Sequence, residues 1–92
     1  MSMGEFSEAT ESFDKGLEIE PHSQDLRNFK SECLFNLGRV DEALELTLAV
    51  LGDRPDSRSA LDNFPEWLLG VVDENLRSNY QARFDALGAR RN

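Results

Sequence analysis

The sequence predicts an all-α protein built from stacked helix–turn–helix units. Apolar side chains recur every three to four residues along the chain, which is the spacing of one face of a helix. Glycine and proline separate these stretches, as tight turns between helices require. In addition, seven of the twenty residues from Gly4 to Ser23 recur unchanged between Gly38 and Ser57, and a fixed period of about 34 residues is typical of helical repeats. We therefore expect four to five helices in a single domain, residues 1–92.

The first predicted helix covers residues 5–20. Phe6, Phe13 and Leu17 fall on one face of it, and acidic residues follow another face at helical spacing. These acidic residues form a stripe of Glu5, Glu8, Glu11, Asp14 and Glu18. We interpret the stripe as a solvated face or, alternatively, as a docking strip for a basic partner. Pro21 ends the helix because proline disfavours helical backbone in the residue before it.

Two further helices are predicted between Ser23 and Pro55. The second covers residues 24–37; Ser23 can cap its start, and Gly38 follows its last apolar position, where a left-handed residue is expected. Its apolar stripe consists of Leu26, Phe29, Cys33 and Leu37. The third helix is expected to begin with Asp41 as its cap. Its apolar residues lie nearly all round, which predicts that it is the most buried helix.

The last third of the chain predicts a short helix and a long one. The short helix lies within residues 56–62. Asn63 stands three residues before Glu66, which is the spacing of a capping box, and Pro65 would lie in the first turn. From there one long amphipathic helix is expected to run nearly to the end of the chain. Its apolar residues are Leu69, Val72, Leu76, Tyr80, Phe84 and Leu87.

The repeated residues resemble the motif of the tetratricopeptide repeat family. They read Gly4, Glu8-Ala9, Phe13, Leu17 and Pro21 in one copy and Gly38, Glu42-Ala43, Leu51 and Pro55 in the next. The resemblance implies a right-handed superhelical stack of helix–turn–helix units, each about 34 residues long. It divides the chain into a half repeat (4–22), a full repeat (23–57), C-terminal capping helices (58–88) and a frayed tail (89–92).

The resemblance leaves the register of the second helix open. Strict counting by the repeat period places Arg27 and Lys30 where the family usually has a large aromatic residue and then leucine. A shift by one residue would place Leu26 and Phe29 there instead. After residue 59 the repeat pattern fails, and we therefore interpret the rest of the chain as capping helices.

The resemblance implies a non-catalytic module for protein–protein interaction. In this family the first helix of a repeat lines the concave face that holds a peptide or a partner helix. On the strict register that face carries Asp25, Asn28, Phe29, Glu32, Phe35 and Asn36. Asparagine suits an extended peptide because its amide both donates and accepts hydrogen bonds. Phe35 lies off the apolar stripe of its helix, so it is a candidate exposed anchor; alternatively, it packs under the C-terminal helix.

A second interpretation is a structural subunit that self-associates. The first predicted helix lacks the partner helix of its own unit, and a repeat cannot bury its apolar face alone. Either the long C-terminal helix folds back over residues 5–20, or two chains form a homodimer through this N-terminal end of the stack.

Composition argues against several other classes. The chain has 18 acidic and 10 basic residues and a net charge of −8, which suits a nucleic-acid backbone poorly, and no apolar run is long enough for a membrane span. The only cysteine, Cys33, is expected to be a buried structural thiol and fits a reducing compartment, the cytoplasm. His22 has no second histidine or neighbouring cysteine and is interpreted as a solvated loop residue. We therefore predict no catalytic site, no metal, no cofactor, and neither nucleic acid nor membrane as a partner.

Overall fold

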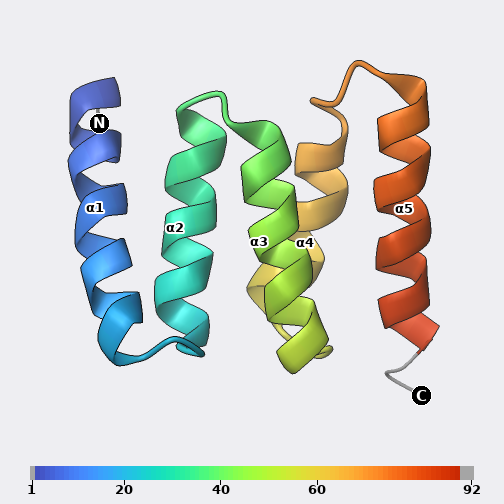
Figure 1. Ribbon diagram of the computed structural model, residues 1–92. Coiled ribbons are helices and arrows are strands. Elements are labelled where there is room, and N and C mark those ends of the chain that lie inside the picture. The colour runs from blue at the N-terminus through green and yellow to red at the C-terminus, as the bar shows by residue number, and fades with distance from the viewer. Residues whose placement is uncertain (1, 90–92) are drawn as a thin grey trace.

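The computed structural model describes residues 2–89, which form five α-helices joined by short loops (Figure 1). They are α1 (Met3–Ile19), α2 (Gln24–Asn36), α3 (Val40–Asp53), α4 (Arg58–Leu68) and α5 (Glu74–Ala89). Consecutive helices run antiparallel and succeed one another from α1 to α5, with α4 behind α3 in the view of Figure 1. No strand occurs between residues 2 and 89, which agrees with the predicted all-α helix–turn–helix stack. Residues 90–92 of the predicted tail lie outside the described residues.

The first two helix starts are capped by serine side chains. Ser23 Oγ accepts a hydrogen bond from the Leu26 amide at 3.3 Å, as its position in the sequence predicts. Gly38 has a φ of +83° and ends α2 in the left-handed conformation that favours glycine. The predicted capping role of Asp41 is wrong, because α3 begins one residue earlier, at Val40, and no side chain caps it.

The long C-terminal helix expected from the apolar spacing is also wrong. The short helix expected within residues 56–62 and the helix start expected at Asn63 are wrong too, because α4 runs unbroken from Arg58 to Leu68 with Pro65 in its interior. The chain then leaves the helical conformation over residues 69–73. Gly70 lies so close to α4 that a Cβ atom there would come within 3.2 Å of the Trp67 carbonyl oxygen. Asp73 then starts a new helix, because its Oδ1 accepts hydrogen bonds from the amides of Asn75 and Leu76.

The core lies between α3 and its neighbours. Its main cluster consists of Leu34, Ala43, Leu44, Leu48, Phe64, Trp67, Leu68, Val71 and Tyr80. A smaller cluster of Val50, Leu51 and Ala60 joins the C-terminal half of α3 to α4. Leu44, Val50 and Leu51 are completely buried, because α3 packs against α2, α4 and α5. The prediction that this helix is the most buried one is therefore confirmed.

The two ends of the stack do not meet. Within the described residues α1 packs only against α2, whereas α5 packs against α3 and α4 at the opposite end (Figure 1). Of the two alternatives for covering the first helix, the one in which the C-terminal helix folds back over it is therefore wrong. The outer side of α1 faces away from the rest of the described chain.

Candidate functional site

The contacts of α2 settle its register. Leu26 faces α1, where a Cβ atom added at Gly16 would lie 3.0 Å from its Cδ1. Arg27 is 6% exposed and faces α3, where its guanidinium contacts Asp53 at 3.0 Å. Ser31 and Leu34 follow Arg27 on the same buried side. Strict counting by the repeat period therefore holds, and the alternative shifted by one residue is wrong.

Arg27 stands where the family usually has a large aromatic residue, and it connects α2 to the preceding turn and to α3. Its guanidinium donates hydrogen bonds to the carbonyl oxygens of His22 at 3.3 Å and Ser23 at 3.4 Å, in addition to its ion pair with Asp53. His22 Nδ1 lies 3.2 Å from the same Asp53 carboxylate. The hydrogen bonds from His22 and Arg27 lower the pKa of Asp53. This network fixes the start of α2 to the end of α3.

Four of the six predicted site residues are exposed on α2. Asp25, Glu32 and Asn36 are exposed, and Asn36 Nδ2 donates a hydrogen bond to the Glu32 carbonyl oxygen at 2.7 Å. Phe29 is 50% exposed, and its ring stacks on Phe13 of α1 with 5.8 Å between centroids. This aromatic pair lies where α1 and α2 meet, beside the exposed polar residues of α2.

Phe35 does not occupy the exposed position expected of an anchor. It is partly buried, and its ring stacks on Trp67 of α4 with 5.0 Å between centroids and 13° between planes. Trp67 is itself buried. Asn28 is also buried, at 8% exposure. Phe35 therefore joins α2 to α4, and Asn28 presents only a small area to a partner.

The structure adds residues of α4 that the sequence interpretation missed. A shift by one repeat period takes Asn28 to Asp62 and Glu32 to Glu66, and both carboxylates are exposed. The same shift takes Asp25 to Ser59, which is exposed as well. Extending the repeat period past residue 59 would have identified these residues. The similarity between the two helices was obscured because Pro65 stands at the position of the buried Ser31 and because the loop after α4 is longer than the loop after α2.

We call the exposed side of these two helices the α2/α4 face. Its acidic residues are Asp25, Glu32, Asp62 and Glu66. None of the four carboxylates forms an ion pair with another of the described residues. A face with four unneutralised carboxylates has a negative potential that favours basic groups.

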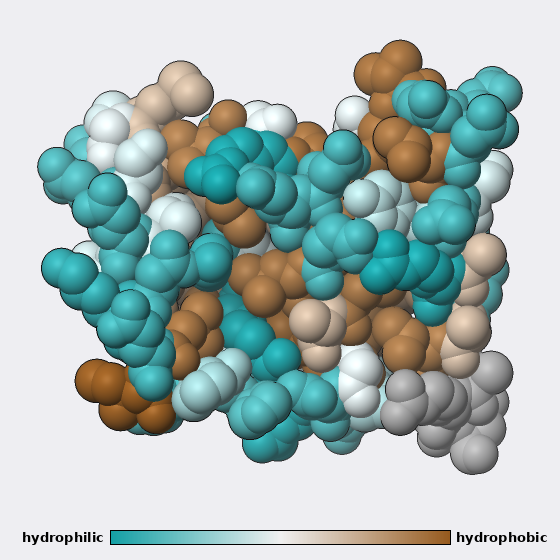
Figure 2. Space-filling view, viewed as in Figure 1, coloured by the Kyte–Doolittle hydropathy of each residue, from teal (hydrophilic) through white to brown (hydrophobic). Residues whose placement is uncertain are grey.

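The acidic stripe of α1 is mostly a solvated face. Glu8, Glu11 and Glu18 are exposed, and hydrophilic side chains dominate α1 in the view of Figure 2. Asp14 is exposed as well, but it differs from them because it forms an ion pair with Lys30 of α2 at 2.5 Å. The exposed surface of α1 is therefore mainly acidic, and its exposed large apolar side chains, Met3 and Ile19, lie at the two ends of the helix.

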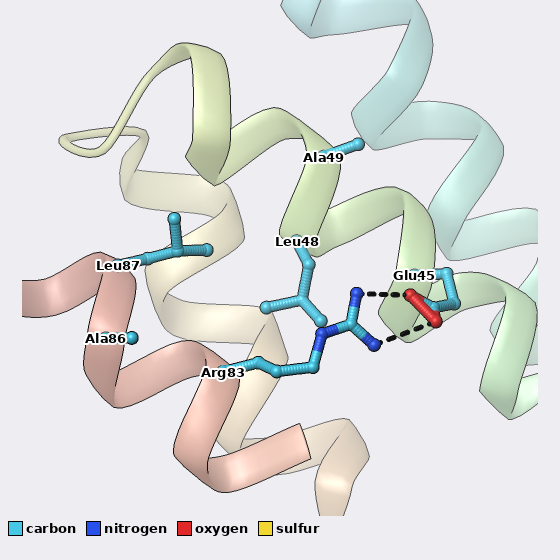
Figure 3. Close-up of a pocket in the computed structure, with 6 residues that line it drawn as sticks. All are labelled: Glu45, Leu48, Ala49, Arg83, Ala86 and Leu87. Atoms are coloured by element: carbon cyan, nitrogen blue, oxygen red, sulfur yellow. Dashed lines mark hydrogen bonds and ion pairs between the residues drawn. The ribbon is translucent and has the colours of Figure 1, made fainter. Parts of the chain in front are cut away.

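A groove lies between α3 and α5, and Figure 3 shows the residues that line it. It is lined by Glu45, Leu48, Ala49, Arg83, Ala86 and Leu87. Arg83 donates two hydrogen bonds to the Glu45 carboxylate, at 2.9 and 2.7 Å, and these bonds lower the pKa of Glu45. Because the charged groups of this groove neutralise each other, it offers a partner no free charge.

No chemistry-bearing cluster is found among the described residues. Cys33 is buried, and burial raises the pKa of its thiol, the opposite of what a nucleophile needs. The described part of the chain has no group of three or more histidine, cysteine or acidic side chains placed to hold a metal ion. None of its helices is both long enough and apolar enough to span a membrane.

Comparison with known families gives one match. A family model described as tetratricopeptide repeat matches residues 1–64, which include α1, α2, α3 and the first part of α4. The matched region therefore extends beyond residue 59, where the sequence pattern was expected to fail. No curated protein and no solved structure matches the chain significantly.

Proposed function

Because the chain belongs to the tetratricopeptide repeat family, whose members are protein–protein interaction modules, we propose that its α2/α4 face binds a basic peptide or partner helix. The family is typically non-catalytic, and we propose the same for this chain. The free, buried thiol of Cys33 supports a reducing compartment such as the cytoplasm. The observation that carries the proposal is the unneutralised negative charge of the α2/α4 face.

The face offers complementary contacts for such a partner. Lysine or arginine side chains would pair with Glu32 and Glu66, which occupy equivalent positions on successive repeats. Phe29 would bury the exposed half of its ring against an apolar side chain, and aromatic residues contribute strongly to binding energy at interfaces. The amide of Asn36 can serve polar groups of a bound backbone. Phe35 supports this face by joining α2 to α4.

The alternative, a homodimer through the N-terminal end, has less support. Two copies of α1 packed by their outward faces would bring Glu8, Glu11 and Glu18 of each chain together. Like charges brought together at an interface oppose association. An acidic outward face instead suits solvent or a basic partner.

A pair of designed peptides tests the proposal. We expect a fluorescent amphipathic peptide of lysine and leucine to bind the chain, with an affinity that falls as salt rises, and a glutamate–leucine peptide of equal length not to bind. The double variant Glu32→Lys, Glu66→Lys should weaken binding at least about tenfold, since two attractive pairs become repulsive.

The control is a second double variant that changes the net charge by the same amount on α1 instead of on the α2/α4 face. Glu11→Lys combined with Glu18→Lys, both on the outward side of α1, should change the affinity by less than about twofold if binding is local rather than a response to net charge. Phe29→Ala should weaken binding without changing its salt dependence. Equal losses for the two double variants would reject the α2/α4 face as the binding site.

A further inference from the structure

The C-terminal end of the stack presents a groove between α4 and α5. Its α4 side is apolar and consists of Pro65, Leu68 and Leu69. Its α5 side carries Arg77, Ser78, Gln81, Ala82 and Asp85. Leu69 is 80% exposed, and Val72, which lies in the adjoining loop but lines a different pocket, is 93% exposed. Apolar side chains this exposed in one neighbourhood are typical of an interaction surface.

The equivalent surface one repeat earlier in the chain is covered by a helix. A shift by one repeat period takes Leu68 back to Leu34 and Leu69 back to Phe35. Leu34 is buried, and Phe35 stacks on Trp67 of α4. The equivalent surface one repeat earlier is therefore covered by a helix, whereas no described residue covers the groove between α4 and α5.

The charges on α5 are self-complementary. Arg77 and Asp85 lie eight residues apart, about 12 Å along the helix. Gln81 lies midway between them, and its Nε2 donates a hydrogen bond to Asp85 Oδ1 at 2.9 Å, which leaves the other carboxylate oxygen for a partner. If a second copy of α5 packs antiparallel about a two-fold axis at Gln81, each Arg77 lies level with Asp85 of the other copy. A two-fold interface needs this self-complementarity, because the same patch serves both chains.

The size of this end of the molecule suits a weak dimer. The two shorter extents of the molecule are 29 and 17 Å. Their product limits the cross-section of the stack to about 500 Å² per copy, so a pair joined over the whole end would bury at most about 1,000 Å², near the lower limit for a specific interface.

From these observations we propose that two copies of the chain form an antiparallel two-fold dimer through the groove between α4 and α5. The proposal is independent of partner binding by the α2/α4 face, since its readout is the oligomeric state. It also differs from pairing through α1, which lies at the opposite end of the stack (Figure 1).

Sedimentation velocity from about 10 µM to about 1 mM, the range for weak association, tests the proposal. We expect the wild-type chain to shift from monomer to dimer across this range. Leu69→Asp, a change at an 80% exposed side chain, should weaken the dimer at least about tenfold without unfolding the monomer, since it places charge in the apolar part of the interface.

Charge reversal gives the sharper test. Arg77→Glu and Asp85→Arg should each weaken the dimer, because each places two like-charged pairs across the axis. An equimolar mixture of these two variants should dimerise again, since both cross-axis pairs then join opposite charges. The double variant Arg77→Glu, Asp85→Arg should likewise restore the dimer. The control Glu18→Lys on α1 should have no effect.

Two outcomes would overturn this dimer. A chain that stays monomeric up to the highest concentration would leave the groove to a different occupant. A dimer that ignores all three groove variants and responds to Glu18→Lys would instead place the interface on α1. Circular dichroism of each variant verifies folding, and this matters most for Arg77, whose guanidinium also donates a hydrogen bond to the Val71 carbonyl oxygen.

Discussion

Phe64→Ala tests whether α4 belongs to the cooperative core or merely covers its edge. Phe64 has no exposed surface, and its ring stacks on Phe84 of α5 with 4.7 Å between centroids. Removing a buried phenylalanine ring typically costs about 3–5 kcal/mol. The whole domain is expected to have an unfolding free energy of about 5–14 kcal/mol at this length. We therefore expect the variant to lose a large fraction of its stability.

Urea denaturation measures this loss through two signals. Fluorescence of Trp67, the only tryptophan, reports on α4, and circular dichroism reports on all five helices. The two transitions should coincide and shift together if the stack unfolds as one unit. The matched control is Leu69→Ala, at an 80% exposed position near the end of α4, which should change stability by less than about 0.5 kcal/mol.

A double-mutant cycle with Phe84→Ala isolates the ring stacking. The two rings lie 4.7 Å apart, and such aromatic pairs contribute about 0.5–1.5 kcal/mol beyond their burial. A loss below about 1 kcal/mol for Phe64→Ala would refute the packing described for α4. Separate transitions for the two signals would refute the single cooperative core.

The remaining predictions concern a turn, an ion-pair network and the attachment of α5. Gly38→Ala should lower the unfolding free energy by about 1 kcal/mol in urea denaturation, because the φ of +83° strains any residue with a Cβ atom. The lowered pKa of Asp53 means that its stabilising effect is complete above the ordinary carboxylate pKa and is lost as pH falls through the lowered value. The difference in melting temperature between wild type and Asp53→Asn should therefore shrink in acid, and a constant difference would contradict this account. Arg83→Met removes the two hydrogen bonds to Glu45 and should cost less than about 1 kcal/mol, since both side chains are about half exposed; faster hydrogen exchange confined to α5 would show the local effect.

The first three helices could be predicted from the sequence because their local signals agree with their packing. Ser23 caps α2, and Gly38 ends it. The register of α2 could not be predicted from hydropathy, because the buried position belongs to Arg27 whereas apolar Phe29 is half exposed. A tertiary ion pair with Asp53 makes this burial of charge possible. Sequence periodicity contains no information about such a pair.

In the C-terminal third, hydropathy predicts a continuous helix where the structure has two. Apolar residues continue at helical spacing through residues 69–73, so their pattern predicts one long helix. The close approach of Gly70 to the Trp67 carbonyl and the cap from Asp73 divide it into two. That division places α4 beside α2 and brings Glu66 into the α2/α4 face, which hydropathy alone could not indicate.

Mapping the bound basic peptide by NMR tests the central claim most directly. Amide chemical shifts of the isotope-labelled chain would be followed while the lysine–leucine peptide is added. We expect the largest changes at the amides of Asp25, Phe29, Glu32, Asp62 and Glu66, with little change along the outward side of α1. Changes confined to α1 or to the groove between α3 and α5, or equal changes with the glutamate–leucine peptide, would contradict the account.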